Sequence, residues 1–306
     1  MDSLTEEFFI PSSRCHYEIS VTLYRPQEAK PKHLPVIVMG HGIGAIKSGG
    51  LSPFAQAFNS AGYAAITFDY IGFGQSGGVP RHVLNVQHEL QDFRDVLAWV
   101  RHDDQSEWVD ASRIVAWGTS FGGMHVTALM SDDHLLAAGI AQCPLVDGRE
   151  RPAKMPLTYT LSLTARALVD AIHSIVSTEG SIHVPLVSDG STAALMASPE
   201  AMEGWARIAP TNGEPQPMTI AARSLFSILA SRPVLHIHKS THPYLVVLPT
   251  WDNEASLDAA EKCVRNAPFG ECLRVEGGHF DLYDGGPSFG KNVDGQLAFL
   301  KRVLRT

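Results

Sequence analysis

The sequence lacks long hydrophobic runs and an excess of basic residues, and each absence excludes a class of protein. No segment comes near the roughly 18 consecutive apolar residues that a membrane-spanning helix needs, so we expect no membrane partner. Lysine and arginine number 24 against 32 aspartates and glutamates, which gives a net charge of −8. A protein that binds nucleic acid usually needs a basic face to neutralise phosphates, so we expect no nucleic-acid partner either.

Cysteine is also scarce, and its four positions form no metal-binding or disulfide pattern: Cys15, Cys143, Cys263 and Cys272. The first residues, MDSLTEEFFIPSS, have an acidic start and no apolar core typical of a secretory signal. We therefore expect reduced thiols and a cytoplasmic protein. With 306 residues, of which 44% are apolar and 18% charged, the chain fits one globular domain carrying an insertion.

Short apolar runs alternate with amphipathic stretches over residues 1–146. The runs predict strands buried on both faces of a sheet, at residues 34–40, 63–69, 113–117 and 137–143. Helical periodicity appears between or after them, at residues 53–61, 89–101 and 121–130. Residues 17–24 alternate in the manner of an antiparallel edge strand. The order predicts an α/β fold with a mostly parallel central sheet flanked by helices.

The alternation stops in the middle of the chain and then resumes. Residues 155–176 predict a long amphipathic helix, and no strong strand follows until residues 243–248. We therefore interpret residues 147–233 as a helical lid inserted into a core made of residues 1–146 and 234–306. A helix at 256–267, a strand at 272–275 and a closing helix at 292–304 complete that core.

The main catalytic signal is the pattern Gly-Thr-Ser-Phe-Gly at residues 118–122, between a predicted strand and a predicted helix. Such a strand-to-helix turn is the context that a nucleophile elbow requires, because only small residues fit beside the serine. The sharp turn exposes the serine hydroxyl above the sheet. Ser120 is therefore the predicted nucleophile.

A serine hydroxyl needs a base, and the base needs a carboxylate that orients it. His279 follows the last predicted strand, where a loop can hold an imidazole above the sheet edge. Asp252 lies just beyond the strand at 243–248 and completes the order Ser, acid, His. Glu254 is two residues away and stays open as the acid.

A second glycine-rich turn, Gly-His-Gly-Ile-Gly at residues 40–44, follows the strand at 34–40. Its open backbone could direct an N–H towards the same point as the N–H of Phe121. Two such donors stabilise the oxyanion of a tetrahedral intermediate. We assign this role to Ile43 and Phe121.

Two other groups of side chains allow competing interpretations. His236, His238 and His242 could suggest a metal site, but no carboxylate or cysteine cluster lies near them, and we predict no metal. Large side chains of the lid either line an acyl pocket or pack the lid on the core: Met155, Tyr159, Met196, Met202 and Trp205.

Four stretches resemble the α/β-hydrolase superfamily, and within it the Xaa-Pro dipeptidyl-peptidase-like branch and fungal polyketide-transferase type hydrolases. They read MGHGIGAIKSGGL, AGYAAITFDYIGFGQSGGVPR, GTSFGG and EGGHFDLY. The resemblance runs over nearly the whole chain. It implies the triad Ser120, Asp252 and His279, a helical lid, and neither a metal nor an organic cofactor.

These observations predict a serine hydrolase acting on a small-molecule acyl ester or thioester, such as a polyketide or another secondary-metabolite intermediate. An acyltransferase that passes the acyl group to an alcohol is the first alternative. A binding protein or a non-hydrolytic cyclase on the same scaffold is the second, because fold does not decide function. A homodimer also stays open.

Overall fold

The computed structural model describes residues 3–26, 33–105, 107–150, 156–177 and 180–305. Its centre is an eight-stranded sheet with the order β1-β2-β4-β3-β5-β6-β11-β12. The strands are β1 Ser3–Pro11, β2 Glu18–Pro26, β3 Leu34–Gly40, β4 Ala64–Phe68, β5 Val109–Thr119, β6 Ala138–Gln142, β11 Tyr244–Pro249 and β12 Gly270–Val275. From β4 to β12 every neighbouring pair is parallel. The predicted mostly parallel sheet is confirmed.

The edge of the sheet differs from the prediction. β2 pairs antiparallel with β1 on one side and with β4 on the other, so β1 is the edge strand and β2 is not. β1 was not expected from the sequence. Its segment, SLTEEFFIP, has two adjacent glutamates and no clean alternation, and its nine-residue pairing with β2 is a tertiary contact that local pattern does not encode.

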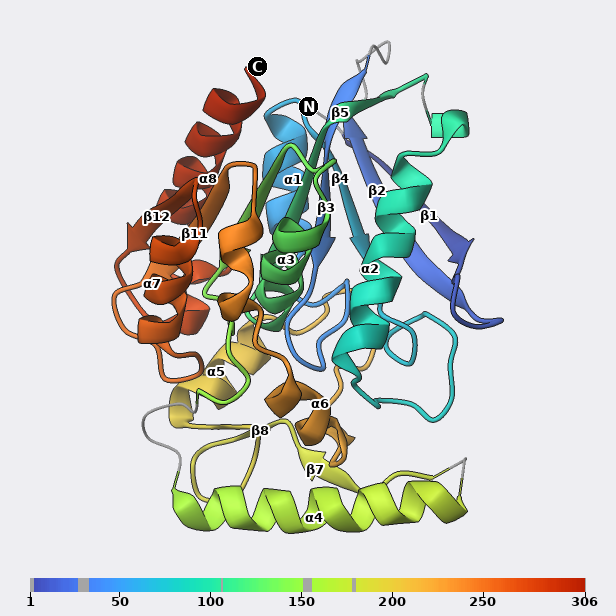
Figure 1. Ribbon diagram of the computed structural model, residues 1–306, viewed down its shortest axis with the longest axis vertical. Coiled ribbons are helices and arrows are strands. Elements are labelled where there is room, and N and C mark those ends of the chain that lie inside the picture. The colour runs from blue at the N-terminus through green and yellow to red at the C-terminus, as the bar shows by residue number, and fades with distance from the viewer. Residues whose placement is uncertain (1–2, 27–32, 106, 151–155, 178–179, 306) are drawn as a thin grey trace.

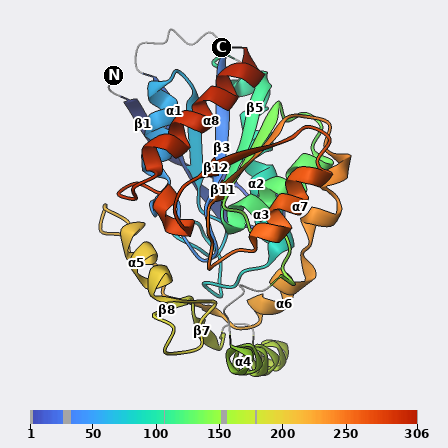
Figure 2. The ribbon, with the colours of Figure 1, turned by 90° about the vertical axis from the view of Figure 1, so that its left-hand side faces the viewer.

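Helices cover both faces of the sheet, as expected for parallel strands. Figure 2 shows α1 (Ser52–Ser60) and α8 (Phe289–Leu304) on one face. On the other face lie α2 (Val86–Val100), α3 (Phe121–Asp132) and α7 (Leu257–Asn266). The apolar strand residues between these layers are fully buried, for example Val36, Ile114 and Trp117.

The segment between β6 and β11 gathers at the end of the sheet towards which the parallel strands run (Figure 1). It contains α4 (Leu157–Val176), α5 (Pro199–Arg207) and α6 (Ser224–Ala230). Two short strand pairs, which the sequence pattern did not reveal, join them: β7 (His183–Pro185) with β10 (Thr219–Ala221), and β8 (Val187–Ser188) with β9 (Met196–Ala197). Strands of two or three residues are too short to show a period. The division into core and lid remains a prediction.

Among the described residues, no helix is long and apolar enough to cross a membrane.

Candidate active site

Ser120 occupies the turn between β5 and α3 in a strained conformation. Its φ is 55° and its ψ is −114°, and a positive φ is costly for any residue with a Cβ atom. Backbone hydrogen bonds hold the turn: the Ser120 N–H donates to the carbonyl of Gln142 at 2.8 Å, and the Ser120 carbonyl accepts from Gly123 at 3.0 Å and Leu145 at 3.1 Å. The neighbouring strand β6 thus stabilises the elbow.

The glycines of the motif are required by close backbone approach. A Cβ atom on Gly118 would lie 2.2 Å from the carbonyl oxygen of Gly122. A Cβ atom on Gly122 would lie 2.3 Å from the carbonyl oxygen of Gly40, at the end of β3. No side chain fits in either place, so both glycines of the Gly-Thr-Ser-Phe-Gly motif are required for steric reasons.

Asp252 and His279 form a buried pair beside this turn. Oδ2 of Asp252 lies 2.8 Å from Nδ1 of His279, and the two side chains are 1% and 3% exposed. Oδ1 of Asp252 accepts from the backbone N–H groups of Glu254 at 2.8 Å and Ala255 at 2.9 Å. The carboxylate is therefore held on both oxygens, which orients the imidazole.

Glu254, the open alternative, makes a different contact. Its Oε1 accepts a hydrogen bond from Oγ of Ser198 at 2.7 Å, at the start of α5. Burial raises the pKa of the Glu254 carboxyl, although the Ser198 hydrogen bond opposes the rise. The structure pairs Asp252, and not Glu254, with His279.

The environment of His279 favours a basic imidazole. Burial by itself would lower its pKa, but the nearby Asp252 carboxylate raises the pKa well above the ordinary value of 6.5. The ring is thus a strong proton acceptor once it is neutral.

Ser120 and His279 line one small cavity, together with Ile43 and Tyr283. In the described part of the chain no hydrogen bond joins Ser120 Oγ to His279, and the His279 Nε2 atom lies 3.8 Å from Sγ of Cys143. Catalytic hydrogen bonds are often loose without substrate and tighten in the complex. The arrangement brings the predicted nucleophile and the predicted base into one cavity.

The turn at residues 40–44 packs directly against the elbow. A Cβ atom on Gly42 would lie 3.4 Å from Cβ of Ser120. Ile43, Ser120 and Phe121 line the same pocket, and Phe121 is the first residue of α3, where N–H groups lack intrahelical partners. Ile43 and Phe121 therefore both lie beside Ser120, and their role as oxyanion donors stays a prediction.

Sequence reasoning missed the polar groups beneath the elbow. Oγ1 of Thr119 lies 2.5 Å from the hydroxyl of Tyr283 and accepts from Nε2 of Gln142 at 3.1 Å. Cys143, immediately after β6, reaches His279. Cys143 follows the carboxyl end of β6, the neighbour of β5, and this position could have marked it in the sequence as a residue near the site.

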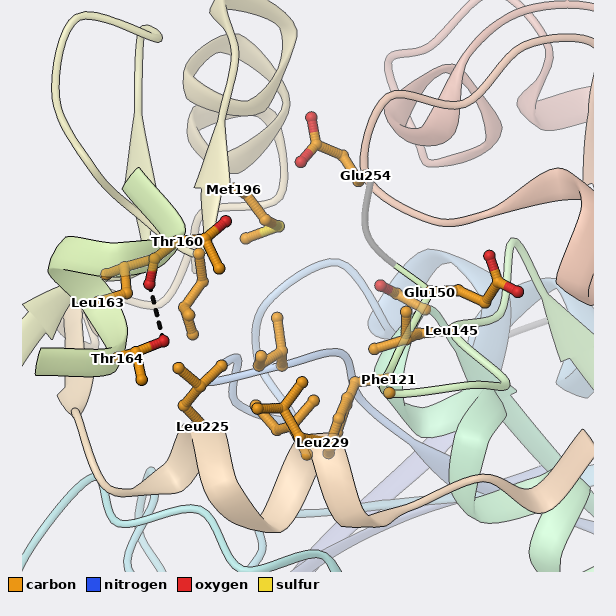
Figure 3. Close-up of a pocket in the computed structure, with 15 residues that line it drawn as sticks. Phe121, Leu145, Glu150, Thr160, Leu163, Thr164, Met196, Leu225, Leu229 and Glu254 are labelled. Carbon is orange, nitrogen blue, oxygen red and sulfur yellow. Dashed lines mark hydrogen bonds between the residues drawn. The ribbon is translucent and has the colours of Figure 1, made fainter. Parts of the chain in front are cut away.

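An apolar pocket opens beside Ser120 (Figure 3). It encloses about 860 Å³ of free space, part of it open to solvent. Its lining comes from the core and from the segment before β11: Ile43, Phe121, Leu145, Thr160, Leu163, Thr164, Leu195, Met196, Leu225, Ile228 and Leu229, with Gly148, Glu150 and Glu254.

Some of the large side chains expected in the lid line a cavity, and others do not. Met196 lines the apolar pocket, and Trp205 lines the small cavity at Ser120. Tyr159 instead donates to the carbonyl of Gly190 at 2.9 Å, and Met202 is partly exposed. Met155 lies outside the described residues.

Within the described ranges, no group of three or more His, Cys, Asp or Glu side chains could hold a metal ion. The histidines at 236 and 238 do not lie on a strand. His238 lies within a short 3-10 helix, Ile237–Lys239, and His236 precedes it.

Loop residues after the last strand also tune this region. Oδ2 of Asp281 accepts from the N–H of Gly278 at 2.9 Å, and Oδ1 lies 3.4 Å from Nη1 of Arg207 on α5. Asp281 thus holds the turn that carries His279, and does not replace Asp252.

Comparisons with known proteins agree with this architecture. The family model for X-Pro dipeptidyl-peptidase (S15 family) matches residues 16–157. The quorum-quenching protein AidA of Acinetobacter baumannii is 36% identical over 285 residues, 93% of this chain and 91% of the relative. The polyketide transferase grgF of Penicillium sp. is 26% identical over 276 residues, 88% of each chain.

The fold is also that of a solved relative. The crystal structure of the α/β hydrolase GrgF from Penicillium sp. superposes with a TM-score of 0.80 at 22% identity, over 99% of this chain and 100% of that one. The chain therefore belongs to the α/β-hydrolase superfamily, in the X-Pro dipeptidyl-peptidase-like branch to which the polyketide transferases are also related.

Proposed function

We propose that this enzyme is a serine hydrolase that cleaves an acyl ester or thioester through Ser120, His279 and Asp252. One observation carries the proposal: a strained serine lines an apolar pocket and shares a cavity with His279, which is buried in contact with Asp252. A strained serine hydroxyl that shares a cavity with a basic imidazole is the arrangement that nucleophilic catalysis needs.

The reaction proceeds in two steps. Ser120 Oγ attacks the acyl carbonyl carbon while His279 Nε2 takes the hydroxyl proton, and the N–H groups of Ile43 and Phe121 bind the oxyanion. The carbon–oxygen or carbon–sulfur bond to the leaving group then breaks, and His279 returns the proton to that group. Water, deprotonated by His279, then attacks the acyl-enzyme carbonyl. The bond between the acyl carbon and Ser120 Oγ breaks, His279 returns the proton to Oγ, and the acid leaves.

The lining of the pocket supports an acyl substrate. Leucine, isoleucine and methionine side chains surround the space next to Ser120, and an aliphatic chain gains by leaving water there. Relatives include a protein named thiohydrolase aneE, 28% identical over 122 residues, 40% of this chain. All four cysteines are free, in keeping with the cytoplasmic location that we propose.

Transfer to an alcohol is the second function that we consider. It is favoured by the polyketide transferase from Penicillium sp., which matches 88% of this chain. In that case an alcohol takes the place of water in the second step. The ratio of ester to free acid, measured with and without added alcohol, separates the two functions.

The first test is intact-protein mass spectrometry after mixing with an activated medium-chain acyl ester. Wild type should show a transient mass increase equal to one acyl group, and Ser120→Ala should show none. Absence of an adduct on wild type, together with failure of a fluorophosphonate to label it, would favour a binding protein or a non-covalent cyclase.

A further inference from the structure

Helix α4 presents an apolar face to solvent. It is the outermost element of the molecule in the views of Figures 1 and 2. Its exposed aliphatic side chains have between 52% and 83% of their surface accessible within the described structure: Leu157, Leu161, Leu168, Val169, Ile172, Ile175 and Val176. Monomeric proteins rarely leave so many large aliphatic residues together on one surface.

The spacing of this face is symmetric about the middle of the helix. The series Leu157, Leu161, Ala165, Leu168, Ile172 and Val176 has intervals of four, four, three, four and four residues. Intervals of three and four place side chains on one stripe of a helix, as in helix pairs. The series reads the same from either end.

Such a series is complementary to itself when two copies run antiparallel about a two-fold axis. The axis would pass between residues 166 and 167, so that Leu157 faces Val176 and Leu161 faces Ile172. At the crossing, the small Ala165 faces the larger Leu168. An isologous contact of this kind requires a self-complementary surface, which the stripe provides.

Charge and area favour a second copy over a lipid surface. Helix α4 carries one arginine and one aspartate. Arg166 is exposed, whereas Asp170 is buried in an ion pair with Arg223 at 2.9 Å. Helices that bind membrane surfaces are usually rich in lysine and arginine, whereas this chain has a net charge of −8. The seven exposed side chains would form the apolar centre of a contact, of which a standard interface buries roughly 800 Å² per partner.

We propose that α4 pairs antiparallel with α4 of a second copy of this chain and forms a homodimer. The opposite side of α4 contributes Thr160, Leu163 and Thr164 to the apolar pocket. The dimer contact would therefore hold one wall of the pocket in place. The dimer itself does not depend on the proposed reaction.

The test is the mass in solution, measured by sedimentation equilibrium or by light scattering after gel filtration. Wild type should have twice the 33.2 kDa of one chain. The double variant Leu161→Glu/Ile172→Glu should have the mass of one chain, with an unchanged circular dichroism spectrum. Phe269→Glu, an equally exposed apolar position outside α4, is the matched control and should stay dimeric.

Cysteine cross-linking tests the antiparallel direction. Leu161→Cys/Ile172→Cys should give an oxidised covalent dimer, whereas Leu161→Cys alone should give no more than the wild-type background. Cross-linking of the single variant would mean a parallel pair. A monomeric wild type, a dimeric double glutamate variant, or a monomer that binds neutral or anionic vesicles would each overturn the proposal.

Discussion

At the scale of single residues, the contacts of two carboxylates indicate which one is the acid of the proposed triad. Asp252 contacts His279 and Glu254 contacts Ser198, although the two carboxylates are two positions apart. We expect Asp252→Asn to lower kcat about 10⁴-fold, because the imidazole loses the partner that orients and stabilises it. Steady-state rates with a confirmed acyl substrate measure this.

Glu254→Gln is the matched comparison for that variant. An amide oxygen can still accept from Ser198, so we expect kcat to change by less than about 10-fold, which corresponds to a barrier change below about 1.4 kcal/mol. A severe loss in Glu254→Gln, with Asp252→Asn near wild type, would assign the acid to Glu254.

The pKa of His279 predicts the pH dependence. Burial opposes the charged ring, but Asp252 raises the pKa well above 6.5. His279 must be neutral to accept the Ser120 proton, so kcat/KM should be low in acid and rise through an apparent pKa above 6.5. Asp252→Asn should move that limb to lower pH in its residual activity. An acidic limb below pH 6.5 in wild type would contradict the structure.

At the scale of elements, the approach of β3 to the elbow explains the second glycine of the motif. In Gly122→Ala the new methyl group would lie 2.3 Å from the carbonyl oxygen of Gly40. We expect the free energy of unfolding to fall by about 1–3 kcal/mol, the usual cost of overpacking, and activity to fall with it. Urea denaturation measures the first effect.

Gly290→Ala is the control for that substitution. Gly290 lies in α8, and a Cβ atom there meets nothing within 4 Å. Alanine in this first turn should leave the free energy of unfolding unchanged or raise it by less than about 1 kcal/mol. Equal destabilisation by both variants would mean that the elbow is not closely packed.

The helices around the pocket should decide the length of the acyl chain. Leu225, on α6, points into the pocket in Figure 3. Leu225→Phe should shorten the space and reduce kcat/KM for an eight-carbon ester about 10-fold or more relative to a four-carbon ester, since each misplaced methylene costs about 1–3 kcal/mol. Leu235→Phe, partly exposed and outside the pocket lining, should leave the ratio unchanged.

At the scale of the whole molecule, a buried amide network joins α8 to the sheet. Oε1 of Gln296 accepts from Nε1 of Trp117 at 2.6 Å, and its Nε2 donates to Oδ1 of Asn292 at 2.6 Å and to Oε1 of Gln142 at 3.1 Å. All four residues are buried. The network connects the last helix to β5 and β6, the strands that hold Ser120.

Gln296→Leu should therefore destabilise the whole fold. It leaves the indole N–H of Trp117 without its acceptor, and each buried polar group without a partner costs about 1–3 kcal/mol. We expect a loss of about 2 kcal/mol or more in the free energy of unfolding. Gln87→Leu, at an exposed position of α2, should change stability little. Similar stability of the two variants would show that the network contributes nothing.

Sequence by itself determined the parallel core and the positions of Ser120 and His279, and it narrowed the acid to Asp252 or Glu254. These features follow from local rules: buried strands read as apolar runs, an elbow needs glycines, and parallel strands end at one edge. Any side chain just after such a strand is therefore brought to the same place, whatever the details of packing.

Tertiary structure decided what depends on contacts between distant segments. The edge strand β1 exists because it pairs with β2, and the pocket exists because α4 and α6 face Phe121. The contact of Asp252 with His279 is set by the N–H groups of residues 254 and 255, which hold one carboxylate oxygen. Two carboxylates in one loop look alike in sequence, and only the path of the backbone decides which one meets the imidazole.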